Sequence, residues 1–384
     1  MFKSKSVQKN IQRSHPVKGE IGKVDIPFLI LVIILLAFGL IMVASSSYVS
    51  ALYKYGDSYH YIKNQLVFAA IGLVAMLVLT FFDYHHFRKL AFPLLIIAVV
   101  LLALVLLPIP ISVKANGARR WLNLGIQFQP SEIGKFAIIV AFSAYISSNY
   151  KHMRRFNVWI FPVLALGLVV GLVAVETHLS GAILILSIGA IMLFVGGVPK
   201  RYFAMVGGAG VVGLASIVMF TPYMQSRIET WQNPTADAQG AGYQIVQSLY
   251  AIGSGGIFGL GLGQSRQKHL YIPEPQNDYI FAITLEELGF VGGLFIILLF
   301  VLLVWRGFVI AFHSRDKFGA LLVIGIVSRV AVQTILNIAV VTNTLPSTGI
   351  SLPFFSYGGT ALVILLAEMG VVLSVSRFSY MEKT

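Results

Sequence analysis

The sequence predicts an all-α polytopic membrane protein with about ten transmembrane helices. Of its 384 residues, 57% are hydrophobic and only 11% are charged, whereas soluble domains carry roughly 25% charged residues. Apolar runs of about 20 residues, long enough to cross a bilayer as a helix, recur along the chain. Lysines and arginines gather on one side of these runs. No soluble domain of ordinary size fits between them.

The predicted spans set the orientation of the chain. They place 18 of the 28 Lys and Arg residues on one side and 8 on the other, with Lys135 and Arg329 inside spans. The richer side is the cytoplasmic one, so both termini are expected there. This asymmetry accounts for the formal charge of +13, and nucleic acid is not expected as a partner. The spans lie near residues 26–47, 65–82, 91–108, 131–148, 158–175, 179–197, 202–220, 278–304, 318–341 and 359–376.

The two ends of the chain are predicted to be short cytoplasmic tails. Residues 1–25 are basic, lack apolar periodicity and are expected to touch anionic membrane lipid. The apolar run that follows is too long for the core of a signal peptide and lacks a clear cleavage site, so it is interpreted as an uncleaved span. The transmembrane domain then covers 26–377, and 378–384 form the second tail. The sequence has no Cys, which excludes disulfides and Cys metal sites.

One outer loop, 221–277, is far longer than the others. Loops of this length in compact proteins are usually functional or disordered, and this one is not of low complexity. Its middle, YQIVQSLYAIGSGGIFGLGLG, is too apolar for a solvated loop and too short and glycine-rich for a span, so we expect amphipathic or re-entrant structure on the bundle. No nucleotide-binding glycine pattern fits it. The spacing of Gly255, Gly259 and Gly263 favours close packing over ligand contact.

The end of this loop carries the strongest candidate for catalysis, in QSRQKHLYIPEPQNDYIFAITLEELGFVGG. Asp278 stands just before a long apolar run in a chain with only 15 acidic residues. An Asp is also a preferred helix cap, and the two roles are compatible. Three cationic candidates, Arg266, Lys268 and His269, lie just upstream in a Pro-stiffened segment. We expect them to converge with Asp278 at the outer boundary of the membrane.

A second polar stretch, NGARRWLNLGIQFQPSEIGKF, leads into the fourth span. Arg119, Arg120 and Trp121 are expected outside, whereas Glu132 and Lys135 share one helix face inside the membrane. Ionised groups there cost roughly 2.5–3.5 kcal/mol on insertion scales and tend to face a cavity. The two are either a mutually neutralised structural pair or the cationic wall of a cavity for an anionic lipid head group.

The remaining polar groups in and near the spans leave more than one interpretation. Arg329 and Glu368 are expected to form a structural ion pair, because nothing else polar clusters with them in the sequence. Glu286 and Glu287 either line the interior or stabilise the bundle. The last outer loop, NTLPSTGISLPFFSYGGTA, is either a tight structural re-entry or part of the site.

These stretches resemble the SEDS family (shape, elongation, division and sporulation), and the resemblance covers essentially the whole chain. The matching pieces are GARRWLNLGIQFQPSEIGKF, PEPQNDYIFAITLEELGFVGG, Gln333 with Asn337, and LPSTGISLPFFSYGG. The segments PEPQNDY and SLPFFSYGG are more similar to the FtsW and SpoVE branch than to the RodA branch. Where many members have a P-D-x-G-type element, this chain has Glu176-Thr177-His178-Leu179-Ser180-Gly181, so the role of that element here stays open.

The resemblance implies particular roles for the residues that match the family's motifs. Asp278 matches the family's essential carboxylate. Glu132 and Lys135 match its paired polar residues in the fourth span, and Ser356 falls in its Ser-Tyr-Gly-Gly element. By these matches the chain is similar to multi-pass enzymes of the bacterial cytoplasmic membrane, with lipid II as substrate and a class B penicillin-binding protein as partner.

The function expected from this resemblance is polymerisation of lipid II into β-1,4 glycan strands for septal division or sporulation. Asp278 is expected to act as general base in an inverting transfer, in which the diphosphate leaving group needs charge stabilisation. Lys135, Arg119, Arg120 or a divalent cation such as Mg or Mn can supply that charge, and the sequence does not choose among them. Two alternatives are a lipid II transporter and a scaffold without catalytic activity.

Overall fold

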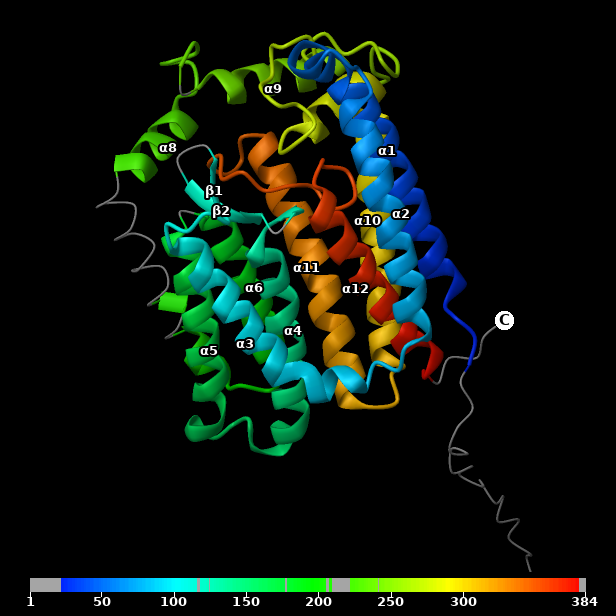
Figure 1. Cartoon of the computed structure of the whole chain (residues 1–384), viewed down its shortest axis with the longest axis vertical. Coiled ribbons are helices and arrows are strands. Elements are labelled where there is room, and N and C mark those ends of the chain that lie inside the picture. Colours follow the sequence, from blue (N-terminus) through cyan, green and yellow to red (C-terminus); the bar gives the residue numbers. More distant parts are fainter. Residues whose placement is uncertain are drawn as a thin grey trace, which may run out of the picture.

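The computed structural model describes residues 22–379 except 116–117, 124, 177, 205–206, 209–221 and 241. Its long helices run side by side and form one bundle (Figure 1). The bundle helices are α1 (Ile26–Tyr55), α2 (His60–Phe81), α3 (His86–Leu106), α4 (Pro130–Asn149), α5 (Phe156–Val175), α6 (Leu179–Val195), α10 (Ile280–Phe312), α11 (Lys317–Val341) and α12 (Gly359–Arg377). A short 3-10 helix, η1 (Tyr150–His152), follows α4.

The predicted spans agree with these helices wherever the structure describes the chain. Within the described residues, seven helices are long and apolar enough to cross a membrane: α1, α2, α3, α5, α10, α11 and α12. The all-α polytopic class is therefore confirmed. The seventh predicted span, 202–220, lies largely outside the described residues, as do most of the two predicted tails. The count of ten spans stays a prediction.

The helices that carry charges lie inside the bundle. In α11 and α12, 72% and 67% of the most apolar window is buried, against 22% in α3. Arg329 on α11 and Glu368 on α12 are both buried, and so is Glu132 on α4. Charged side chains inside a membrane are tolerated where they face protein rather than lipid. The helices α3 and α5, in which only 22% and 28% of the most apolar window is buried, cover the outside.

A small antiparallel sheet joins α3 to α4, a feature that the sequence analysis did not predict. Its strands are β1 (Ser112–Ala115), β2 (Ala118–Asn123) and β3 (Gln127–Phe128), in the order β1-β2-β3. Trp121 on β2 lies opposite Val113 on β1. The sheet lies at the same end of the bundle as α8 (Pro222–Gln232) and α9 (Tyr243–Gly255) (Figure 1). We call this end the site end.

The amphipathic structure predicted for the middle of the long loop is confirmed. In α9, Ile245, Val246 and Ala251 are buried, whereas Tyr250 is 59% exposed. The helix lies across the site end and packs on α10 (Figure 1). One apolar side that faces protein is what an amphipathic helix needs to be stable there.

Close packing is also confirmed for two of the three spaced glycines. A Cβ at Gly255 would collide with the carbonyl of Leu285, and one at Gly259 with the carbonyl of Glu287. Gly263 has open space around its Cα and is required instead by its positive φ of 80°.

The helix α10 is broken at Gly289, which has φ 69° and ψ −173°. The backbone of the segment 256–261 lies against this break. Leu260 N donates to the Glu286 carbonyl at 2.9 Å, and Phe290 N donates to the Gly256 carbonyl at 2.9 Å. These bonds satisfy groups that an unbroken helix would pair internally.

Candidate active site

Asp278 lies at the site end, two residues before α10, and its backbone is held from two sides. Asn337 Nδ2 of α11 donates to the Asp278 carbonyl at 2.9 Å and to the Ile350 carbonyl at 2.7 Å. Ser356 Oγ donates to the Asn277 carbonyl at 2.8 Å and accepts from Leu352 N at 2.7 Å. Ser356 therefore positions the chain next to Asp278 through its hydroxyl.

The interpretation of Asp278 as a helix cap is not supported. The residue at the cap position of α10 is Tyr279, and no side chain makes a capping hydrogen bond there. The Asp278 carboxylate instead faces the last loop, where Gly349 has φ 70° and a Cβ would lie 3.2 Å from Asp278 Oδ2. A side chain at Gly349 would both be strained and crowd the carboxylate.

Burial and neighbouring charges set the acidity of Asp278. Burial raises the pKa of its carboxyl to about 6, and the negative charge of Glu274 also raises it, whereas Arg120 and Arg227 lower it. A group with a pKa near 6 is largely ionised at neutral pH and can still accept a proton. Asp278 is therefore suited to act as a general base.

The cations that act on Asp278 are not the ones expected from the sequence. Lys268 is buried and its Nζ lies 3.0 Å from Glu287 Oε1, so it is occupied elsewhere. Arg266 and His269 are exposed on the loop, and none of the three contributes to the electrostatics of Asp278. The predicted convergence on Asp278 is therefore not seen: Lys268 pairs with Glu287 instead, and the cations that act on Asp278 are Arg120 and Arg227.

Arg227 is a site residue that sequence reasoning missed. It comes from α8, and its Nη1 donates to the Ser347 carbonyl at 3.0 Å and to Ser347 Oγ at 2.6 Å. These bonds hold its guanidinium against the last loop, close enough to lower the pKa of Asp278. No motif marks Arg227, because only the fold brings α8 to this loop.

Three of the predicted site residues, Arg119, Arg120 and Trp121, lie on β2. Of these, only Arg120 is among the charges that change the pKa of Asp278. Its Nε donates to the Glu176 carbonyl at 3.4 Å. Arg119 Nη1 donates to the Leu107 carbonyl at 3.3 Å. Trp121 is half-buried in the sheet. The alternating directions of a strand separate Arg119 from Arg120.

The element around Glu176, whose role the sequence left open, adjoins this site. Ser180 Oγ donates to the Gly349 carbonyl at 3.4 Å and lies 3.4 Å from His178 Nδ1. Burial raises the pKa of Glu176 to about 8, and the positive charge of Arg120 opposes that rise. Burial, with the positive charges of Arg120 and Lys135, lowers the pKa of His178 to about 3, so this imidazole is neutral at physiological pH.

Glu132 and Lys135 belong to a buried network of four charges. Lys135 Nζ lies 2.6 Å from Glu132 Oε1, and Arg329 Nη2 lies 2.6 Å from Glu132 Oε2. Arg329 also pairs with Glu368. The expectation that Arg329 and Glu368 stand apart from other polar groups is wrong, because α4, α11 and α12 are neighbours in the bundle. The network balances two cations against two carboxylates, as buried charges require.

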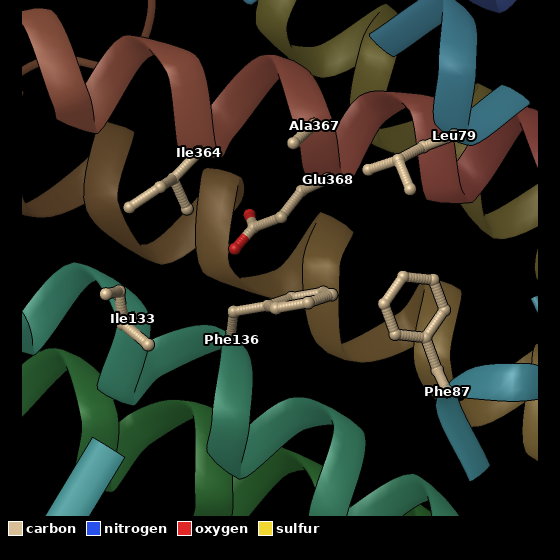
Figure 2. A pocket seen from close by; sticks show the side chains of 7 residues that line it. All are labelled: Leu79, Phe87, Ile133, Phe136, Ile364, Ala367 and Glu368. Atoms are coloured by element: carbon tan, nitrogen blue, oxygen red, sulfur yellow. The ribbon is translucent and has the colours of Figure 1, made fainter. Parts of the chain in front are cut away.

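An apolar cavity of about 200 Å³ lies beside this network. Figure 2 shows the Glu368 carboxylate among its apolar side chains. The lining residues come from α2, α3, α4 and α12: Leu79, Phe87, Ile133, Phe136, Ile364, Ala367 and Glu368. Asp278 is not among them, so the cavity is separate from the site end.

A metal centre built from protein side chains alone is not found in the part of the chain that the structure describes. No three His, Asp or Glu residues there are grouped so that they could hold an ion. The charges that act on Asp278 come from one carboxylate, Glu274, and two arginines, a set with too few oxygen ligands for a divalent cation.

The fold and the site define a polytopic membrane protein with a carboxylate–arginine site at one end of its bundle. The chain belongs to the FtsW/RodA/SpoVE family, described as cell cycle proteins, which it matches over residues 26–381. The predicted resemblance to the SEDS family is thereby confirmed.

Individual relatives cover nearly the whole chain. Stage V sporulation protein E of Bacillus subtilis is 43% identical over 92% of this chain and 97% of its own length. A probable peptidoglycan glycosyltransferase FtsW of Geobacter sulfurreducens is 38% identical over 93% of this chain and 96% of its own.

Solved structures agree in fold. The Thermus thermophilus rod shape determining protein RodA is 28% identical with a TM-score of 0.68, covering 94% of this chain and 98% of that one. A chain of a peptidoglycan synthase complex that coordinates polymerization and crosslinking is 28% identical with a TM-score of 0.78, covering 94% and 99%.

Proposed function

We propose that the protein is a peptidoglycan glycosyltransferase that polymerises lipid II into β-1,4 glycan strands during septal wall synthesis. The observation that carries this proposal is the Asp278 carboxylate at the site end, whose pKa is about 6 and is lowered by the positive charges of Arg120 and Arg227. The FtsW relatives, 36–38% identical, bear the name of this activity. Their similarity extends over the segments that build the site.

The proposed reaction is a single inverting displacement. The Asp278 carboxylate takes the proton of the acceptor GlcNAc 4-hydroxyl while that oxygen forms a bond to the anomeric carbon of the donor MurNAc. The bond from this carbon to the diphosphate oxygen breaks, and its electron pair leaves with the lipid diphosphate. The α-linked donor thereby becomes a β-1,4 linkage.

Arg120 and Arg227 are the groups we assign to the leaving diphosphate. Guanidinium groups suit phosphate oxygens because their donors form a planar fork. A diphosphate needs its negative charge stabilised and does not need a proton, so one carboxylate suffices. Lys135, Glu132, Arg119 and Trp121 stay candidates for contacts to the rest of the lipid II head group.

The proposed site faces the outside of the cytoplasmic membrane, with both chain termini in the cytoplasm. An outer site cannot rely on cytoplasmic nucleotide sugars, so the donor has to carry its own activation. A polyprenyl-diphosphate sugar meets this need and enters from the bilayer. The positive-inside charge pattern supports this orientation.

A class B penicillin-binding protein is the proposed partner. The similarity to a chain of a peptidoglycan synthase complex supports it, since that complex combines polymerization with crosslinking. A partner that crosslinks strands would receive the polymer directly at the site end.

Polymerisation in detergent micelles tests the enzyme against both alternatives. The purified protein, with its cognate penicillin-binding protein and transpeptidation blocked, is given lipid II where no sealed bilayer exists. A transporter has nothing to cross there and a scaffold makes no product, so glycan strands support the enzyme. Absence of strands from folded protein, together with lipid II movement across vesicles, would contradict it.

A further inference from the structure

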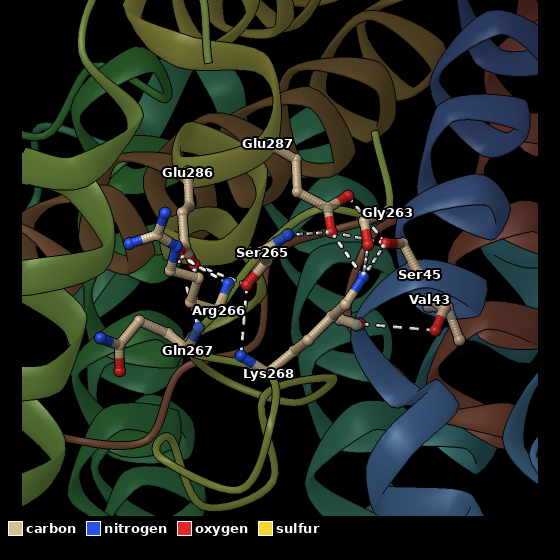
Figure 3. Close-up of polar contacts among 10 residues, drawn as sticks. Val43, Ser45, Gly263, Ser265, Arg266, Gln267, Lys268, Glu286 and Glu287 are labelled. Carbon is tan, nitrogen blue, oxygen red and sulfur yellow. Dashed lines mark hydrogen bonds and ion pairs between the residues drawn. The ribbon is translucent and has the colours of Figure 1, made fainter. Parts of the chain in front are cut away.

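A second buried polar cluster lies away from Asp278, where α1, the long loop and α10 meet. Figure 3 shows Lys268 and Glu287 converging with Ser45, and Glu286 turned toward the backbone of the loop. Lys268 is 5% exposed, Glu287 1% and Glu286 0%. The reaction proposed above uses none of these groups.

Lys268 and Glu287 join three separate segments. Lys268 Nζ lies 2.6 Å from the Gly263 carbonyl, 3.0 Å from Glu287 Oε1 and 3.2 Å from Ser45 Oγ of α1. Ser45 Oγ in turn donates to Glu287 at 2.7 Å. A buried ion pair with its hydrogen bonds satisfied holds its partners in one arrangement.

Glu286 holds the loop through its backbone. Its carboxylate accepts from Ser265 Oγ at 2.5 Å and from Arg266 N at 2.9 Å. Gln267 N approaches the same carboxylate at 3.4 Å. Three converging donors satisfy a buried carboxylate without a cation.

These contacts matter for Asp278 because of the break in α10. The segment 280–288 ends at Gly289, so its position is not fixed by continuity with the rest of the helix. Asp278 lies just before one end of this segment, and Glu286 and Glu287 lie at the other. The side on which Asp278 lies is held by Asn337 and Ser356, as described above. The other end is held by Lys268, Ser45 and the loop.

We propose that Lys268, Glu286 and Glu287 are positioning residues for Asp278. They form a clamp that fixes the segment 280–288 against α1 and thereby sets the place of the Asp278 carboxylate relative to Arg120 and Arg227. This inference rests on the proposed function, because it assigns the clamp a role in that reaction. None of the three residues needs to touch the substrate.

The double variant Lys268→Met/Glu287→Leu tests the clamp. It removes both charges together, so neither is left buried and unpaired, and it retains similar volume. We expect kcat for lipid II polymerisation to fall roughly 10-fold or more, because small misplacements of a catalytic group are costly. The KM for lipid II should stay within about twofold, since the clamp lies outside the binding groups.

Amide hydrogen exchange on the same protein gives a readout that is independent of activity. Exchange at residues 270–279 should become roughly 10-fold faster in the double variant, as a local opening there becomes easier. Lys54→Met is the matched control, because Lys54 also joins α1 to this loop, through an exposed pair with Glu274 at 3.0 Å. It should change neither kcat nor exchange beyond about twofold.

Two results would overturn the clamp: a folded double variant with wild-type kcat, or a loss of kcat with unchanged exchange at 270–279. Asp278→Asn in the same assay separates the two proposals. If that variant keeps its activity, Asp278 is not the general base and the proposed mechanism fails, whereas faster exchange in the double variant still shows that Lys268 and Glu287 hold this segment.

Discussion

Asp278 combines an ionised carboxylate with a site that disfavours its charge. Partial burial and Glu274 raise its pKa from the usual 3.8 to about 6, and Arg120 and Arg227 limit the rise. Glu176, close to Arg120, has a pKa of about 8 and is mostly protonated at neutral pH. Two carboxyl groups near one arginine thus have different protonation states, which is how environment assigns different roles to like groups.

The pH dependence of activity follows from the ionised form of Asp278. We expect the polymerisation rate to fall as the pH drops through about 6, because the base becomes protonated.

The same shift in pKa changes the stability of the fold in the opposite direction. Protonation of Asp278 stabilises the folded state, and this contribution is fully present below pH 3.8 and is lost as the pH rises through about 6. Asp278→Asn should therefore unfold at a higher temperature than wild type at pH 7.5. A lower unfolding temperature would contradict the raised pKa.

Arg120→Met should lower the rate and move its pH profile. Removing one of the two cations that stabilise the leaving diphosphate is expected to lower kcat roughly 10²-fold. Because Arg120 lowers the pKa of Asp278, its removal should shift the acid limb of the profile to higher pH. Arg266→Met, on the exposed part of the loop, is the control. If the acid limb of the pH profile stays in place in Arg120→Met, Arg120 does not act on the pKa of Asp278.

At the scale of elements, the bundle depends on how its charged helices pack. Lys135, Glu132, Arg329 and Glu368 come from α4, α11 and α12, and their charges cancel inside the bundle. The cavity beside Glu368 is otherwise lined by apolar side chains, so no protein group there can replace a lost partner. These helices therefore hold one another through contacts that are costly to break singly.

Arg329→Met should destabilise the bundle by roughly 3–5 kcal/mol, because it leaves two buried carboxylates without their shared cation. The double variant Arg329→Met/Glu368→Met leaves Glu132 paired with Lys135 and should recover most of the loss. Thermal unfolding of the purified proteins measures both. Equal losses in the single and double variants would show that the pairing is not what stabilises these helices.

Hydropathy predicted the elements that cross the membrane, because the backbone N–H and C=O groups of a long apolar run in lipid have to pair within a helix whatever its neighbours are. The sheet β1–β3 was missed, since strands of two to six residues in a connection leave no such signal. Asp278 was predicted from its place before a long apolar run and from its match to the family's essential carboxylate. Arg227 was missed because only the fold brings α8 to the last loop. Lys268 was assigned to the wrong partner because its pairing with Glu287 depends on how the long loop folds against α10.

At the scale of the whole molecule, α8, α11, the sheet and the last loop meet around Asp278 at one end of the bundle. Asn337 and Ser356 tie α11 and the last loop to the backbone at Asp278, and the sheet carries Arg120 to the same place. A polar site at the mouth of an apolar bundle suits a substrate with a lipid tail and a sugar head.

The orientation of the bundle can be tested directly, because the sequence has no Cys. Tyr53, at the site end of α1, is 77% exposed, and Lys151, at the other end, is also exposed. In intact spheroplasts, Tyr53→Cys should react with an impermeant maleimide and Lys151→Cys should react only after permeabilisation. The reverse pattern would place the site in the cytoplasm and contradict the proposed lipid II chemistry.

The most direct test of the central claim is the initial rate of glycan strand formation from lipid II by wild type, Asp278→Asn and Arg266→Ala. These are compared at equal amounts of folded protein in complex with the cognate penicillin-binding protein. If Asp278 is the general base, its substitution lowers the rate roughly 10²–10⁴-fold, whereas Arg266→Ala stays within about twofold. Asp278→Asn with a rate within tenfold of wild type would contradict the assignment of the carboxylate.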